Sequence, residues 1–409
     1  MRDLIYRGDS CFTYATSIAA TWVWAPAIFV ASSMAYFNGL YGFLWFLIPN
    51  ILTLIVFGYF AQRFVREKGY DSFVGLTDLF FDTRQERLHS IVSYVLMLAS
   101  LSVQLVGLNI LINTFFPSIP IHISTICVSL FCYLYTKIGG IKLCIISDSW
   151  KYYTMLGVGI LLLGNLLYNG VDFSHLTFYG INKPEFMSMS LSFGVITAIG
   201  LFSAPYVDNT FWQRVFSIDK TNILKTFSYS AVFFGLIPLV FGMIGFLSTN
   251  VSNSGWVITQ VFSNSTILTL LLCFAIFLAL IATIDSVLCA CYSLTTKEFP
   301  KFNSISMEVL LTLGTMLVII FEPTIVDLFL LYGTIRTATA IPTVLTICER
   351  YNKDRLFYST LIAVLVGSFG YLTMALLNLP YGYIFTIFAF LVPLLGYSKS
   401  VDKYSDVVL

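Results

Sequence analysis

The sequence alternates between long apolar segments and short polar ones. A segment of about 20 apolar residues is long enough to cross a bilayer as a helix, and twelve such segments follow one another along the 409 residues. The predicted spans are 12–37, 41–62, 90–113, 120–136, 143–167, 189–206, 223–248, 266–292, 304–321, 325–347, 357–377 and 381–397. The pattern predicts an all-α, polytopic membrane protein, with one transmembrane domain over 1–409 embedded in a lipid bilayer.

The composition excludes a soluble protein. Hydrophobic residues make up 58% of the chain and charged residues 11%, with a mean hydropathy of +0.86, whereas soluble domains carry about a quarter charged residues. The net charge of +1 and the lack of a segment that is both basic and aromatic argue against a nucleic-acid partner. The eight cysteines lack metal-ligand spacing, so we interpret them as packing residues. Nothing in the sequence indicates an enzyme or an obligate protein partner.

The positive charges indicate how the chain is oriented. Cytoplasmic connections carry an excess of Lys and Arg. With a cytoplasmic N-terminus, nineteen of the 22 basic residues fall in inner connections, Arg214 among them. Lys183 falls outside, while Lys151 and Arg336 lie within spans. This partition predicts a multi-pass protein of the plasma membrane, or of the inner membrane in a bacterium, with its N-terminus in the cytoplasm.

Two spans contain the same Ala-Pro step. Pro26 lies in the middle of the first span, and Pro205 lies in the sixth, shortly after Gly200. Paired interruptions are typical of transporters built from two inverted halves, whose broken helices expose polar backbone groups at the substrate site. The predicted units are a first repeat of about 12–167, a second of about 189–347 and extra helices of about 357–397. We expect an ion or polar-solute site between spans 1 and 6, closed by spans 3 and 8.

Four segments resemble the sodium:solute symporter family, which has a LeuT-type fold of 5+5 inverted repeats plus additional helices. They are "IAATWVWAPAIFVASSMAYFNGLYGFLWFLIPN" in span 1, "KIGGIKLCIISDSWK" at span 5, "DNTFWQRVFS" after span 6 and "ALIATIDSVLCACYSLTTKEF" in span 8. They occur in family order and at family spacing, over nearly the whole chain. The first segment alone is most similar to the urea-transporter branch. The resemblance implies sodium-coupled secondary active symport of a small polar solute by alternating access, with Na+ as the coupling ion.

The resemblance also implies a sodium site between spans 1 and 8. The carbonyl groups of Ala20 and Val23 flank the interruption in span 1. Span 8 supplies Ala279, Ala282 and Thr283 at i, i+3 and i+4, which share one helix face. Ala282 replaces a Ser of the relatives, so the site has one oxygen fewer for a hard cation that prefers several. The alternative functions are a proton-coupled transporter and a solute-sensing membrane module of the same fold.

Four charged residues lie inside predicted spans, where a charge is costly and usually functional. Asp148 and Asp285 match aspartates of the family, and Asp285 either handles ions or anchors span 8 through hydrogen bonds. Lys151 either pairs with Asp148 at an inner gate or extends to the cytoplasmic interface. Arg336 either pairs with a carboxylate of another helix or lines the aqueous cavity, unless the span boundary is shifted.

Polar and aromatic residues surround the two interrupted spans. The candidates for the solute cavity are Thr21, Trp22, Trp24, Gln104, Phe202, Ser203 and Tyr206. For the aromatic side chains, packing in the core or against lipid is the alternative role. Gln213 and Arg214 are expected in an inner connection, as an anchor or as part of a gate. Gly139 and Gly140 predict a tight turn before span 5.

Overall fold

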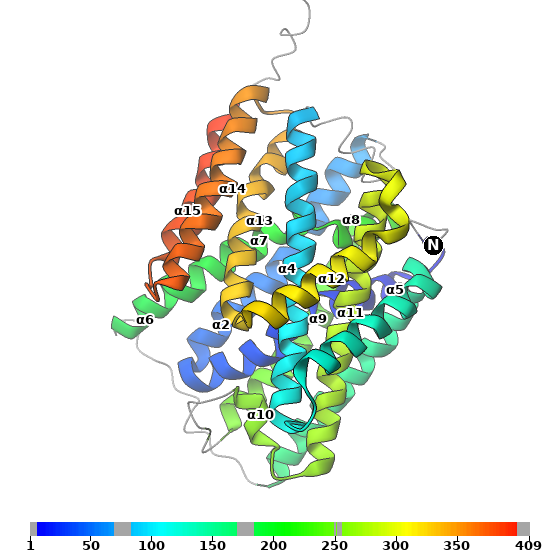
Figure 1. The fold of residues 1–409 in the computed structure, drawn as a ribbon, viewed down its shortest axis with the longest axis vertical. Coiled ribbons are helices and arrows are strands. Elements are labelled where there is room, and N and C mark those ends of the chain that lie inside the picture. The colour runs from blue at the N-terminus through cyan, green and yellow to red at the C-terminus, as the bar shows by residue number, and fades with distance from the viewer. Residues whose placement is uncertain (1–5, 69–82, 170–183, 249–250, 252–255, 399–409) are drawn as a thin grey trace, which may run out of the picture.

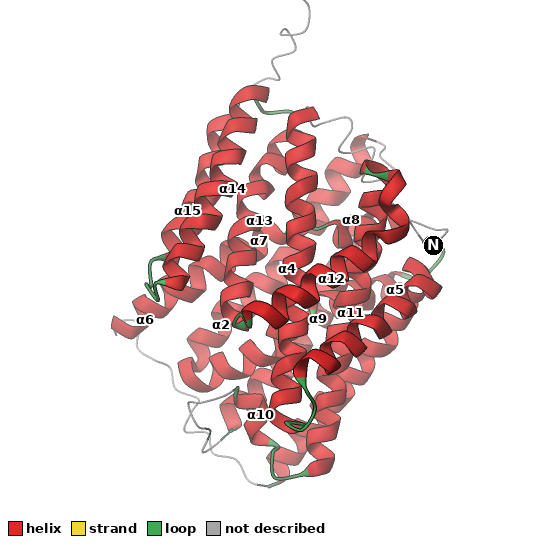
Figure 2. Cartoon of the chain, viewed as in Figure 1, coloured by secondary structure: helices red, strands yellow, loops and turns green. Residues whose placement is uncertain are grey.

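The structure is a computed structural model that describes residues 6–68, 83–169, 184–248, 251 and 256–398. In these ranges the chain forms helices joined by short connections, as Figure 2 shows. The single β contact among them is an isolated bridge between Tyr351 and Tyr397. The predicted all-α class is confirmed. Lys183, which the sequence places on the outer side, lies outside the described residues.

The helices follow one another as labelled in Figure 1. They are α1 (Cys11–Trp22), α2 (Ala25–Lys68), α4 (Thr83–Phe115), α5 (Ile121–Tyr168), α6 (Pro184–Met189), the π-helix η1 (Ser190–Val195), α7 (Ile196–Val207), α8 (Asn209–Ser217), α9 (Ile223–Leu247), α10 (Val257–Val261), α11 (Thr266–Glu298), the 3-10 helix η2 (Pro300–Ile305), α12 (Ser306–Phe321), α13 (Ile325–Ile347), α14 (Lys353–Leu376), α15 (Gly382–Leu391) and the 3-10 helix η3 (Val392–Gly396).

The number of crossings agrees with the sequence. In the part of the chain that is described, nine helices are long and apolar enough to cross a membrane, and Gly382–Gly396 forms a shorter apolar helix. Two of the nine turn sharply at a glycine, Gly39 with φ 59° and Gly140 with φ 58°. Glycine adopts positive φ without the steric penalty of a side chain. Each turn separates two predicted spans, so the nine helices correspond to eleven predicted spans and Gly382–Gly396 to the twelfth.

The first predicted helix break is present. Helix α1 ends at Trp22, and Val23 has a non-helical backbone (φ −79°, ψ 81°) before α2 begins at Ala25. Pro26 lies in the first turn of α2, where its missing N–H leaves no helical hydrogen bond unmade. The first predicted span therefore consists of α1 and the first part of α2, with the non-helical residues Val23 and Trp24 between them.

The second break lies later than predicted. Helix α7 continues through Pro205 to Val207, and Asp208 is extended (φ −92°, ψ 112°) before α8 begins. The Asp208 carboxylate accepts a hydrogen bond from the N–H of Thr210 at 3.0 Å, which caps the N-terminus of α8. Gln213 and Arg214, which the sequence places in an inner connection, lie between the apolar helices that end at Val207 and begin at Ile223, and both are buried in the helix α8.

Small residues let α7 and α13 approach closely. A Cβ atom added to Gly200 on α7 would lie 2.8 Å from the Cα of Gly333 on α13.

Large apolar side chains such as Leu161 and Phe321 are exposed on the outside of the bundle, as expected of a surface that faces lipid. In Figure 1, α14 and α15 lie on the side of the bundle opposite the N-terminus.

Candidate functional site

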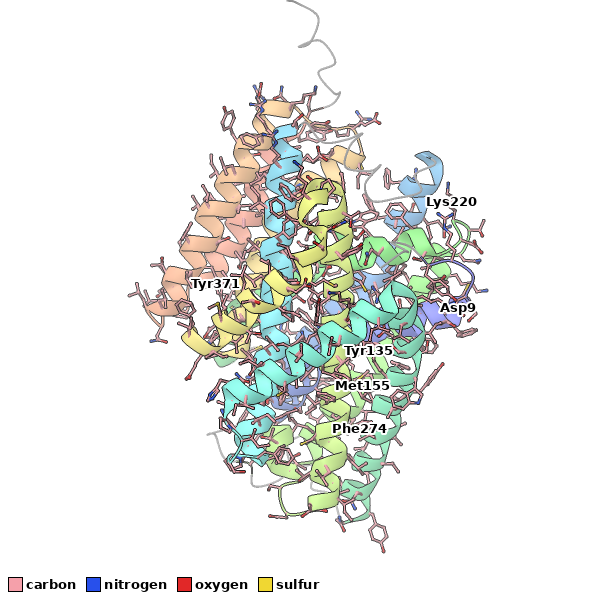
Figure 3. All side chains as sticks on the ribbon, turned by 45° about the vertical axis from the view of Figure 1, so that its right-hand side comes forward. Asp9, Tyr135, Met155, Lys220, Phe274 and Tyr371 are labelled. Carbon is pink, nitrogen blue, oxygen red and sulfur yellow. The ribbon has the colours of Figure 1, made fainter. Side chains whose placement is uncertain are left out.

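A buried lysine joins two carboxylates at the centre of the molecule. The Nζ atom of Lys151 lies 3.1 Å from Asp148 Oδ1 and 2.5 Å from Asp285 Oδ2. Lys151 and Asp148 come from α5, and Asp285 comes from the middle of α11. Tyr135, labelled in Figure 3, places its ring centroid 5.2 Å from the same Nζ atom. The predicted Asp148–Lys151 pair is present, and Lys151 is buried instead of reaching the interface.

Arg214 adds a second positive charge to this group. Its side chain is fully buried, and its Nη2 atom lies 3.3 Å from Asp148 Oδ2. The other acceptors of the guanidinium are Ser17 Oγ at 3.2 Å, Thr21 Oγ1 at 2.8 Å, Ser286 Oγ at 2.7 Å and the Thr210 carbonyl at 3.0 Å. Arg214 reaches this position because α8 restarts at the break and turns inward.

We call Asp148, Lys151, Arg214 and Asp285 the four-charge cluster. With both carboxylates ionised and both basic groups protonated, its charges balance. Ser17 Oγ donates a further hydrogen bond to Asp148 Oδ2 at 2.8 Å. Removing one member of a buried ion pair strands the other in a low-dielectric environment. The cluster therefore links α1, α5, α8 and α11 through groups that depend on one another.

The residues expected to bind sodium lie beside this cluster. Thr283 Oγ1 is 3.2 Å from the Thr21 carbonyl and 3.3 Å from the Ala279 carbonyl, so span 1 and span 8 meet as predicted. Ala20, Val23, Ala279 and Ala282 are completely buried. The Ala282 carbonyl accepts a hydrogen bond from Ser286 Oγ at 2.9 Å. Backbone oxygens and the hydroxyls of Thr283, Thr21 and Ser286 thus lie between α1 and α11, and the last two hydroxyls are bonded to Arg214.

This arrangement does not fit a sodium ion. Sodium is a hard cation that needs several oxygen ligands, and Ala282 supplies no side-chain oxygen. Ser286, in the turn that follows, already accepts a hydrogen bond from Arg214. Both oxygens of Asp148 are engaged by positively charged groups of the protein. A further cation would enter a group whose charges are already balanced.

A second buried arginine lies at the other break. Arg336 on α13 is 3% exposed, and its Nη2 atom lies 3.4 Å from Asp208 Oδ2. Its guanidinium carbon lies 3.4 Å from the ring centroid of Tyr332 and 5.1 Å from that of Trp24. The Tyr332 hydroxyl also lies 3.4 Å from Asp208 Oδ2. We call Trp24, Asp208, Tyr332 and Arg336 the Arg336 site, and it brings the two helix breaks together.

The Arg336 site has unused hydrogen-bond donors. Among the described residues, none accepts a hydrogen bond from Arg336 Nε or Trp24 Nε1, and Thr197 Oγ1 also lacks a partner. A cavity of about 10 Å³ lies beside Arg336 and Thr197, lined in part by Gly200 and Gly333. This volume has room for about one water molecule. Buried donors without acceptors are costly, so the site is suited to a ligand that supplies acceptors.

The other predicted cavity residues do not converge at one place. Trp22 packs on Phe211, with ring centroids 5.0 Å apart, and Thr21 belongs to the four-charge cluster through Arg214. Tyr206 packs on the aromatic rings of α2. The Ser203 hydroxyl donates a hydrogen bond to the Ile199 carbonyl of its own helix. Gln104 is buried, and its amide nitrogen lies 3.4 Å from the Ser100 carbonyl. Phe202 is half-buried on α7.

Sequence reasoning missed Asp208, Tyr332, Ser17 and Ser286, and it underestimated Arg214. A signal for Asp208 was present, because Asp-Asn-Thr at the end of a helix is typical of an N-cap that starts another one. Ser17 and Thr21 are four residues apart, which places both on one face of α1. Nothing in the sequence showed that this face meets Arg214.

The fold is similar to those of solved transporters. A Na+-coupled sialic acid symporter in a substrate-bound outward-open state gives a TM-score of 0.73 at 17% identity, covering 95% of this chain and 89% of that one. Mhp1, a nucleobase-cation-symport-1 transporter, in a closed conformation gives 0.59 at 16% identity, covering 95% and 91%. A manganese transporter of Eremococcus coleocola gives 0.57 at 12% identity, covering 96% and 88%.

No family model matches the chain, and no curated protein matches its sequence. At such low identities the structural similarity shows the fold, which is the LeuT-type fold of the predicted class. The comparisons give no support to the urea-transporter branch suggested by one segment of the sequence.

Proposed function

We propose that this protein is a secondary transporter that moves a small polar solute across a membrane by alternating access. The observation that carries the proposal is the Arg336 site, where a buried guanidinium with unused donors lies between two broken helices. The structural similarity to transporters of other solutes supports the same function. The inverted repeats proposed at about 12–167 and 189–347 each begin with one of these broken helices.

The chemistry of the Arg336 site favours a solute with a carboxylate or a comparable group of hydrogen-bond acceptors. A guanidinium presents several donors in a plane and matches a carboxylate in a bidentate manner. Asp208 holds Arg336 through one contact of 3.4 Å between Nη2 and Oδ2, and the Nε atom has no acceptor among the described residues. Trp24 and Tyr332 provide aromatic walls for the rest of a small solute.

Solute entry requires a movement of the helices around the site. A cavity of about 10 Å³ is too small for any solute larger than water. The close approach of Gly200 and Gly333 closes one side of it. Separation of α7 from α13 would open this side, which is the kind of gating step that alternating access needs.

The family resemblance implies sodium as the coupling ion, and the sodium coupling of one structural neighbour is consistent with it. The ligand set found between α1 and α11 does not favour that part of the prediction, so the proposed function does not include it. We further propose a plasma-membrane location with a cytoplasmic N-terminus. An impermeant thiol reagent added outside cells should then label a cysteine placed at Asn378 but not one placed at Lys301.

The test of transport uses purified protein reconstituted into liposomes. Uptake of radiolabelled amino acids, sugars, sialic acid and simple carboxylates is measured against empty liposomes, in sodium and in potassium buffers. We expect uptake of at least one carboxylate-bearing solute, and its loss in Arg336→Gln. The matched control is Arg84→Gln, which removes an arginine from the exposed pair with Asp354 and should transport normally. Uptake of a solute that Arg336→Gln leaves unchanged would contradict the assigned site.

A further inference from the structure

We propose that Lys151 and Arg214 take the place of a bound coupling cation, so that this protein binds no sodium between α1 and α11 and handles its solute without it. The statement about solute handling rests on the proposed transport function. The statement about sodium binding does not, and it is tested without any solute. The proposal departs from the family resemblance at residues that the structure places in direct contact.

The protein's own cations reach the two helices that would hold the ion. Thr21 presents its carbonyl to Thr283 Oγ1 and its hydroxyl to Arg214 Nη2, 2.8 Å away. Ser286 accepts a hydrogen bond from the same nitrogen and donates one to the Ala282 carbonyl. Arg214 therefore bridges the end of α1 and the middle of α11, which a sodium ion would otherwise bridge.

The acidic oxygens at this position already accept hydrogen bonds from protein donors. Asp148 Oδ2 accepts from Ser17 and Arg214, and its Oδ1 accepts from Lys151. Asp285 Oδ2 accepts from Lys151 at 2.5 Å. A sodium ion would have to displace an ammonium or guanidinium group that is covalently tethered to the chain and thus present at a very high effective concentration.

The balance of charge leads to the same conclusion. Two carboxylates face two basic groups, and all four side chains are at least 95% buried. A sodium ion added to this neutral group would bring one uncompensated positive charge into a low-dielectric environment, next to two like charges. Removing one basic group leaves the cluster with one excess negative charge, which a sodium ion could then balance.

The wild-type test uses sodium alone as the probe. Thermal unfolding of the purified protein is followed over a series of NaCl concentrations, with KCl and choline chloride at equal ionic strength, and direct binding of 22Na+ is measured in parallel. We expect the same melting temperature in all three salts and no saturable 22Na+ binding. Saturable 22Na+ binding to the wild type, or stabilisation by NaCl alone, would overturn the proposal.

The variants test whether the two basic groups are the reason that the wild type binds no sodium. Lys151→Gln and Arg214→Gln should each gain saturable 22Na+ binding and a sodium-specific rise in melting temperature of about 2 °C or more at concentrations well above Kd. Lys151→Arg keeps the charge and should gain neither, and the double change Lys151→Gln with Asp285→Asn restores neutrality and should also gain neither. Lys297→Gln removes a lysine from a pair with Glu86 outside the cluster, and it is the matched control.

A further variant distinguishes the effect of the two basic groups from that of the missing oxygen. Ala282→Ser restores the hydroxyl that relatives carry while leaving both basic groups in place, and we expect it to bind no sodium. Sodium binding by Ala282→Ser would show that the lost oxygen, not the resident cations, excludes the ion, and would refute the proposal even if Lys151→Gln fails to fold. Failure of the proposed transport function would instead appear as absent uptake, whatever the sodium results are.

Discussion

The two buried arginines of this protein have opposite surroundings. Arg214 has hydrogen-bond acceptors on α1, α5, α8 and α11, and its charge is balanced within the four-charge cluster. Arg336 has one carboxylate contact of 3.4 Å and an Nε atom without an acceptor among the described residues. Both lie beside a helix break. The difference supports the proposal that Arg214 is part of the scaffold, whereas Arg336 contacts a ligand.

The contrast follows from how buried charges are stabilised. A buried charge is tolerated when its hydrogen-bonding capacity is satisfied, and a partly satisfied group is costly. A protein keeps such a group where a ligand completes it. Hydrogen-bond completeness therefore separates the two sites more clearly than burial does, because both arginines are at most 3% exposed.

The largest expected effect is on the stability of the cluster. Lys151→Gln leaves two carboxylates without their shared counterion, and we expect a loss of about 3 to 5 kcal/mol in the free energy of unfolding. Thermal and denaturant unfolding in potassium buffer measure it. Adding Asp285→Asn to this variant should recover part of the loss, whereas purely additive losses would contradict the paired arrangement.

The next effect separates binding from stability at Arg336. Arg336→Gln should weaken binding of a carboxylate-bearing solute by about ten- to a hundredfold, which corresponds to about 1.5 to 3 kcal/mol for a charged hydrogen bond. The melting temperature should change little, because the Asp208 contact is long. Solute titrations and unfolding curves on the same preparation give both numbers. A large loss of stability with unchanged affinity would make Arg336 a scaffold residue like Arg214.

A smaller effect concerns the glycines that close the Arg336 site. Gly200→Ala places a Cβ atom 2.8 Å from the Gly333 Cα, which should cost about 1 to 3 kcal/mol through overpacking. Gly333→Ala is the matched control, because its nearest contact, the Gly200 Cα at 3.5 Å, is an ordinary one. Unfolding measurements should rank Gly200→Ala as the more harmful change. Equal effects would mean that α7 and α13 are farther apart than described.

The smallest expected effect is the loss of an exposed ion pair, which serves as a reference for the buried ones. Arg84 and Asp354 form an ion pair of 2.6 Å whose side chains are 50% and 70% exposed. Exposed pairs contribute about 0 to 1 kcal/mol, so Arg84→Gln should barely shift the unfolding curve. A loss as large as that of Lys151→Gln would show that burial does not distinguish these ion pairs.

Hydrophobic pattern alone predicted the crossings, because a segment of fixed length in a bilayer has few alternatives to a helix. The turns at Gly39 and Gly140 separate predicted spans, and the break before Pro26 lies where the sequence placed it. The second break was placed too early. Pro205 is accommodated within α7, and the carboxylate of Asp208 determines where the next helix starts.

The candidate site was predicted less completely because it depends on contacts between distant segments. The Asp148–Lys151 pair is local, three residues apart on one helix, and was therefore visible in the sequence. The contact of Lys151 with Asp285 joins residues 134 positions apart. Arg214 lies between two predicted spans, as the sequence indicated, but its complete burial depends on contacts of α8 with α1, α5 and α11.

Helix α8 connects the two buried arginines mechanically. Asp208 caps its first turn and contacts Arg336, and Arg214 lies near its other end, within a rigid rod of about 13 Å for nine residues. On the proposed function, a solute that drew Arg336 away from Asp208 would release one end of this rod while the four-charge cluster held the other. By thermodynamic reciprocity, a solute that favoured one orientation of α8 would in turn be bound more tightly by that orientation.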